Sequence, residues 1–218
     1  MKKINCLILI LFIVLTILTI SSRLNINNSI NSVEVIYDKE TILFVGDSIT
    51  DRYSLKKFYN YNNKLVINSG VGGYTTNDII KRFRNLIEQY NPDKLFLMIG
   101  TNDIGDGTSK EDIIKNIDEI ISMIKEKEPD TKIYLETIYP VNLDKRKQDK
   151  RRNNKIISDI NKELEKYCKD NDVVFIDIYS HLVDENDNLK SEYTEDGLHV
   201  NDFGYEVITT ILKTYIED

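Results

Sequence analysis

Thr41-Ile42-Leu43-Phe44-Val45-Gly46-Asp47-Ser48-Ile49-Thr50 is the stretch from which the fold of this chain can be worked out. Its apolar and β-favouring residues run without polar alternation into Gly-Asp-Ser, which predicts a strand buried on both faces and then a tight turn. Ser48 would lie just beyond the carboxyl end of that strand, where open α/β sheets bind ligands. The serine could act there beside the free N–H groups of the next helix, or Asp47-Ser48 could simply cap that helix.

The same alternation of buried strand and helix continues to the end of the chain. Further strands are predicted at 64–68, 94–99, 132–137 and 173–178, and helices at 77–90, from Thr108 or Ser109, over a basic stretch ending near Lys169, and from about Asp202. The crossovers are long enough only for parallel pairing. The pattern therefore predicts an α/β fold, a doubly wound three-layer α/β/α sandwich with a five-stranded parallel sheet.

Composition limits the function classes. The chain has 218 residues, 41% of them hydrophobic and 30% charged, and a net charge of −7 that argues against general nucleic-acid binding. Its two cysteines and two histidines, Cys6, Cys168, His181 and His199, form no cluster with zinc-ligand spacing. We expect no metal and no cofactor.

The N-terminus differs from the rest. Residues 1–24 read as an export signal or a membrane anchor, because Lys2 and Lys3 precede an apolar run within 4–22. Both alternatives place the body of the protein outside the cytoplasm, either anchored by the N-terminal segment or secreted. Residues 25–40 are predicted to be a polar linker and 41–218 the folded domain.

Polar or glycine-rich turns follow the first three strands and precede the last helix, so we expect them at one edge of the sheet. They contribute Ser48, Gly73, Asn102 and the pair Asp196 and His199. An aspartate three residues before a histidine can hold one imidazole nitrogen across a turn and leave the other free to accept the serine proton. With donors for an oxyanion nearby, these residues suit acyl transfer.

Four blocks in this order resemble those of SGNH, or GDSL-type, esterases and lipases. They are Gly46-Asp47-Ser48-Ile49-Thr50, Asn68-x-Gly70-x-x-Gly73-x-Thr75, Gly100-Thr101-Asn102-Asp103 and Asp196-Gly197-Leu198-His199. The resemblance implies a flavodoxin-like SGNH hydrolase domain over residues 41–218. Tyr139 departs from the smaller or aliphatic residue of many relatives, and we expect it to shape the pocket.

The resemblance also implies roles for individual residues. Ser48 would be the nucleophile, His199 the base and Asp196 the residue that orients the base. The oxyanion hole would consist of the backbone N–H groups of Ser48 and Gly73 and the side chain of Asn102. His181, after the fifth strand, is expected to be structural.

The resulting hypothesis is a serine esterase that hydrolyses a short, acetyl-like ester on a cell-envelope or extracellular carbohydrate through an acyl-serine intermediate. Three alternatives remain open: a lysophospholipase- or thioesterase-like lipid hydrolase, an O-acyltransferase using the same triad, and a non-enzymatic surface binding module.

Two groups of charged residues have more than one interpretation. The run from Lys145 to Lys155 holds seven basic residues and one acid, Asp149. It reads as a solvated helix face, or else as a surface that attracts an anionic polymer or lipid. Asp47 and Asp103 could together hold a metal, but solvated helix caps are the preferred interpretation.

Overall fold

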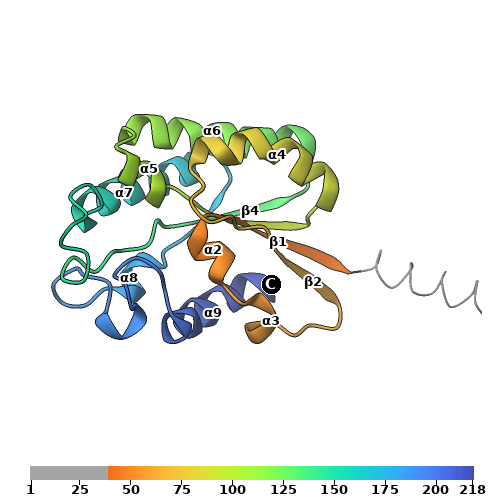
Figure 1. Ribbon diagram of the computed structural model, residues 1–218. Coiled ribbons are helices and arrows are strands. Elements are labelled where there is room, and N and C mark those ends of the chain that lie inside the picture. The colour runs from red at the N-terminus through yellow and green to blue at the C-terminus, as the bar shows by residue number, and fades with distance from the viewer. Residues whose placement is uncertain (1–38) are drawn as a thin grey trace, which may run out of the picture. The chain divides into compact units, whose positions relative to one another are not determined.

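The apolar runs form a five-stranded, all-parallel sheet in the computed structural model, which describes residues 39–218. The strand order β2-β1-β3-β4-β5 is the flavodoxin-like order and confirms the predicted fold class (Figure 1). The strands are β1 (Glu40–Gly46), β2 (Lys64–Asn68), β3 (Lys94–Met98), β4 (Lys132–Glu136) and β5 (Val174–Ile176).

Helices cover both faces of this sheet, as the unbroken apolar strands require. Successive side chains of β1 point to opposite faces of the sheet: Leu43 and Val45 pack into the core on one face, and Ile42 and Phe44 into the core on the other. The first layer contains α4 (Thr76–Tyr90), α6 (Lys110–Lys127) and α7 (Asn154–Asp170) (Figure 1). The second contains α2 (Ser48–Arg52), α3 (Leu55–Phe58), α8 (Tyr179–Leu182) and α9 (Asp202–Ile216), while α5 (Thr101–Asp106) and the short helix η1 (Ser191–Tyr193) follow β3 and α8.

The basic stretch ending near Lys169 was predicted to be helical, and this is correct from Asn154 onward but wrong for the residues before it. Residues 143–152 form turns, and α7 begins only at Asn154, capped by the side chain of Asn153, which accepts from the backbone N–H of Ile156. The carboxylate of Asp149 accepts from the backbone N–H groups of Arg151 and Arg152 and so replaces helical hydrogen bonds. Of the seven basic residues of the run, only Lys155 lies in α7, so the run as a whole does not form a solvated helix face.

The predicted export signal or anchor at 1–24 and almost all of the predicted linker lie outside the described residues. Within residues 39–218, no helix is long and apolar enough to cross a membrane.

A buried acid lies at the carboxyl end of β4. The carboxylate of Glu136 is buried and accepts a 2.5 Å hydrogen bond from the hydroxyl of Tyr139, which is only 4% exposed. Tyr139 was expected to shape the pocket, but it packs in the core between the sheet and α9 instead. Burial raises the pKa of Glu136 to about 7, although the bond from Tyr139 opposes the shift.

Glu136→Gln is expected to stabilise the protein more at pH 8 than at pH 5. Between the ordinary pKa of 4.5 and the folded value of about 7, the folded protein keeps a proton that the unfolded chain releases, so stability falls as the pH rises through this window. Glutamine removes this penalty and can still accept from Tyr139. In urea unfolding, the gain over wild type should grow by roughly 2 kcal/mol between the two pH values.

The exposed Glu185→Gln serves as the matched control and should show no such pH dependence. A difference between Glu136→Gln and wild type that is the same at both pH values would contradict this assignment.

Candidate active site

Ser48, His199 and Asp196 form one hydrogen-bonded chain at the carboxyl edge of the sheet. The Ser48 Oγ lies 2.9 Å from the His199 Nε2, and the His199 Nδ1 lies 2.6 Å from the Asp196 Oδ2. Ser48 is the first residue of α2, directly after β1, and His199 precedes α9, so the fold brings together residues 151 apart in sequence.

The turn before α9 fixes the imidazole. The second carboxylate oxygen of Asp196 accepts from the backbone N–H groups of Leu198 (2.9 Å) and His199 (2.8 Å). Partial burial raises the pKa of Asp196, but the hydrogen bonds from the His199 ring and from these two N–H groups outweigh it and bring the pKa down to about 2. An ionised carboxylate only accepts, so the His199 Nδ1 carries the proton and Nε2 is free to accept from Ser48.

Three hydrogen bonds fix the position of α2, the helix that carries Ser48. The buried carboxylate of Asp47 caps α2 by accepting from the backbone N–H of Ile49 at 2.9 Å. The Tyr205 hydroxyl donates to the Ile49 carbonyl and the Asn68 side chain donates to the Thr50 carbonyl, both at 2.6 Å. The capping and the catalytic interpretations of Gly-Asp-Ser are thus compatible, since Asp47 caps while Ser48 contacts His199.

The three predicted oxyanion donors lie at the starts of α2 and α5 and in the glycine loop between β2 and α4. A side chain at Gly72 would come within 3.9 Å of the Ser48 Cβ, so the glycine loop borders Ser48. The Asn102 Nδ2 donates to the carbonyl of Tyr74 at 2.9 Å, which places the amide beside the same loop. Gly73 has a φ of +81°, a left-handed conformation that favours glycine. Within the described residues, the backbone N–H groups of Ser48 and Gly73 donate to no other group.

Comparison with known proteins agrees with this geometry. The family model of the GDSL-like lipase/acylhydrolase family matches residues 44–207, a span that contains all four sequence blocks. The chain belongs to this family. The matched domain is thus that of an ester-hydrolysing enzyme.

Individual relatives share the domain but differ in length. The chain is 32% identical over 193 residues to an N-acylneuraminate cytidylyltransferase of Escherichia coli, a match that covers 84% of this chain and 42% of the relative. It therefore spans about two fifths of the length of this relative and of similar cytidylyltransferases from Streptococcus agalactiae. Among solved structures, it is similar to one from Streptococcus pneumoniae described as a platelet activating factor (33% identity, TM-score 0.75, covering 82% of this chain and 84% of the other). It is also similar to a GDSL-like lipase of Bacteroides thetaiotaomicron (26% identity, TM-score 0.71, covering 82% and 88%).

The two aspartates that were expected to be solvated caps are both fully buried in this GDSL-like hydrolase. Asp103 accepts from the backbone N–H of Thr76 at 3.0 Å and from its hydroxyl at 2.5 Å, which joins α5 to the start of α4. Burial raises the pKa of Asp47 to about 7, and the nearby Asp103 adds to this effect against the N–H of Ile49. Asp103 therefore ties α5 to the start of α4, whereas Asp47 caps α2 from a buried position.

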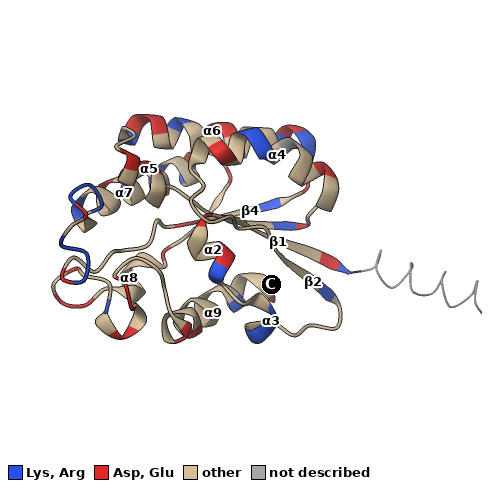
Figure 2. Ribbon diagram, in the orientation of Figure 1, with Lys and Arg blue, Asp and Glu red and all other residues tan. Residues whose placement is uncertain are grey.

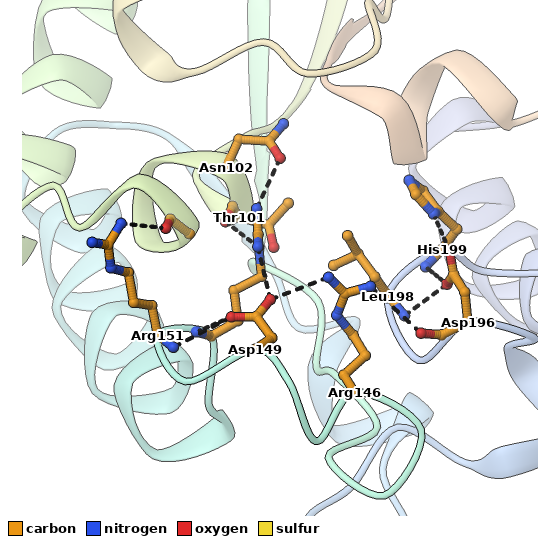
Figure 3. A network of polar contacts seen from close by, with 10 residues as sticks. Thr101, Asn102, Arg146, Asp149, Arg151, Asp196, Leu198 and His199 are labelled. Carbon is orange, nitrogen blue, oxygen red and sulfur yellow. Dashed lines mark hydrogen bonds and ion pairs between the residues drawn. The ribbon is translucent and has the colours of Figure 1, made fainter.

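One set of polar residues beside this site was not predicted to belong to it. Arg146, Asp149 and Arg152 lie in the basic turns before α7, where Figure 2 shows a concentration of positive charge near α5 and α8. Figure 3 shows Arg146 between Asp149 and the turn that holds Asp196 and His199. The unusual feature in the sequence was a lone acid within a basic run, which could have indicated a buried ion-pair centre. His181 lies exposed in α8, apart from the Ser48–His199 pair.

Proposed function

We propose that this GDSL-like hydrolase is a serine esterase in which Ser48 is the nucleophile, His199 the general base and Asp196 the residue that orients it. The observation that carries this proposal is the continuous hydrogen-bonded chain from the Ser48 Oγ to the Asp196 Oδ2. Side chains in this arrangement can remove the serine proton during attack, because Asp196 stabilises the imidazolium that forms.

The reaction proceeds in two halves. The Ser48 Oγ passes its proton to the His199 Nε2 and attacks the ester carbonyl, and the backbone N–H groups of Ser48 and Gly73 and the Asn102 amide stabilise the oxyanion. The alcohol then leaves with the proton from His199, and an acyl-Ser48 ester remains. Water gives a proton to His199 and attacks this ester. His199 then returns the proton to the Ser48 Oγ as the C–O bond breaks, which releases the carboxylic acid and free Ser48.

We infer that the acyl group is short and that the alcohol is hydrophilic, as in an acetylated carbohydrate. A long acyl chain needs an apolar channel, because the burial of each methylene away from water is favourable by about 0.8 kcal/mol. Four apolar residues of the long loop 179–201 on this edge face inward instead: Leu182 and Leu189 are fully buried, and Leu198 and Val200 are less than 9% exposed. The similarity to an enzyme named for N-acylneuraminate, an acylated sugar acid, supports a carbohydrate as the alcohol.

The acyl-chain profile tests this inference. We expect kcat/KM to be at least about tenfold higher for p-nitrophenyl acetate or butyrate than for the palmitate ester, because the site offers little apolar surface to the longer chain. The same detergent must be present with every ester, and Ser48→Ala gives the background for each. A preference for acyl chains of twelve carbons or more would favour a lipid hydrolase instead.

A parallel assay addresses group transfer. Products are analysed with and without a sugar acceptor, and hydrolysis predicts the free carboxylic acid in both cases. Formation of the acylated sugar at the expense of the acid would make the enzyme an O-acyltransferase.

We further propose that residues 1–24 direct this domain out of the cytoplasm, as a cleaved signal or a retained anchor. The support is the basic start followed by the apolar run of the sequence. Cell fractionation with an antibody to the domain should find it in the membrane or outside the cell, and replacement of residues 4–22 by polar residues should retain it inside. Equal distribution of both forms would contradict the proposal.

A further inference from the structure

The basic run from Lys145 to Lys155 contains one acid, Asp149, and the loop before α7 is organised around it. The Asp149 carboxylate accepts from the side chains of Arg152 (2.8 Å) and Arg146 (3.2 Å), and its other oxygen accepts from two backbone N–H groups of the same loop. Asp149 is only 12% exposed and Arg152 15%. Burial raises the pKa of Asp149, but the hydrogen bonds from Arg152 and Arg146 outweigh it and lower the pKa to about 2.

Arg152 extends from this centre to the start of α5, which carries Asn102. Its Nε donates to the carbonyl of Thr101 at 2.8 Å, and its Nη2 donates to the Asn102 Oδ1 at 3.2 Å. Gly105 makes room for it, because a Cβ there would lie 2.1 Å from the Arg152 Nη2. The planar guanidinium thus joins Asp149, Thr101 and Asn102 with one donor each.

These contacts determine which way the Asn102 amide faces. Its oxygen accepts from Arg152, and one of its two N–H bonds is directed to the Tyr74 carbonyl. A flipped amide would place its NH2 group against the guanidinium and its oxygen against the Tyr74 carbonyl, which loses both hydrogen bonds. The second N–H bond of Nδ2 therefore stays available on the side of the glycine loop.

We propose that Arg152 is a positioning residue of the oxyanion hole, which acts by holding the Asn102 amide with its NH2 group toward the developing oxyanion. Asp149 in turn holds the guanidinium in place. This inference rests on the proposed role of Asn102 as an oxyanion donor. It gives a function to part of the basic run that differs from attraction of a polymer.

A double-mutant cycle with Asn102 tests the proposal on the full chain. Arg152→Gln is expected to lower kcat for p-nitrophenyl acetate about tenfold with KM little changed, because the disoriented donor acts on the tetrahedral intermediate. In the Asn102→Ala background, Arg152→Gln should change kcat less than twofold, since the amide that it orients is gone. Arg151→Gln is the matched control, because Arg151 lies in the same loop and donates to the Gly105 carbonyl without touching Asn102.

The proposal would be overturned if Arg152→Gln lowered kcat by the same factor with and without Asn102, because the two residues would then act independently. A wild-type kcat in the Arg152→Gln variant would also overturn it. If the Arg152→Gln variant does not fold, Arg152→Lys, which keeps a cation at this position, replaces it in the cycle. The loss of kcat caused by Arg152→Lys should likewise disappear in the Asn102→Ala background. Ser48→Ala, measured alongside, separates this outcome from failure of the proposed function. An active Ser48→Ala variant refutes the esterase mechanism, whereas an inactive one with unchanged Arg152 variants refutes only the role of Arg152.

Discussion

Ser48→Ala is expected to lower kcat for a short-chain ester by a factor on the order of 10⁶, to the level that substrate binding and the oxyanion donors sustain without a nucleophile. His199→Ala should cost about as much, because the proton of Ser48 then has no acceptor. Asp196→Ala should leave more activity, since this carboxylate assists the proton transfer without receiving the proton. Steady-state kinetics on p-nitrophenyl acetate measures all three.

Matched substitutions elsewhere serve as controls. Ser54→Ala replaces an exposed serine whose side chain makes no capping bond at the start of α3, and His181→Ala replaces the exposed histidine of α8. Both should retain wild-type kcat, and thermal unfolding should show that all five variants fold. Substantial activity in a folded Ser48→Ala variant would contradict the mechanism.

Asn102→Ala is expected to lower kcat by roughly a hundredfold to a thousandfold with KM little changed. The Asn102 amide is partly buried and borders the glycine loop, so the hydrogen bond that it offers gains strength as negative charge develops on the carbonyl oxygen. Comparison of kcat and KM on p-nitrophenyl butyrate separates this effect from weaker substrate binding.

Asn102→Asp sharpens the test. It keeps the shape of the side chain but exchanges both N–H donors for a carboxylate, so it should be at least as damaging as alanine. An effect of either variant confined to KM would contradict the role of Asn102 as an oxyanion donor.

The fold could be predicted because the strands are buried on both faces. The residues that lead into Gly46, and the run from Lys94, are almost wholly apolar, and this pattern has few explanations other than a parallel sheet covered by helices. The positions of Ser48, Asn102 and His199 followed from the same topology, since parallel strands bring their carboxyl ends to one edge.

The environment of charged residues could not be predicted in this way. Asp47 and Asp103 were assigned to solvent because aspartates at helix starts usually are exposed, yet backbone N–H groups hold both in the interior. In the sequence, Asp149 could be considered only as one negative charge among basic neighbours. In the structure, its hydrogen bonds replace a predicted helical turn and hold Arg152 against Asn102. These outcomes depend on which loops meet in space, and local sequence does not record that.

Covalent labelling shows whether Ser48 is the nucleophile. A fluorophosphonate should add one adduct per chain of the wild-type protein, and peptide mapping should locate it on Ser48. The folded Ser48→Ala variant should show no adduct under the same conditions, and Ser54→Ala should label like wild type. An adduct on another residue, or labelling that persists in Ser48→Ala, would contradict the assignment.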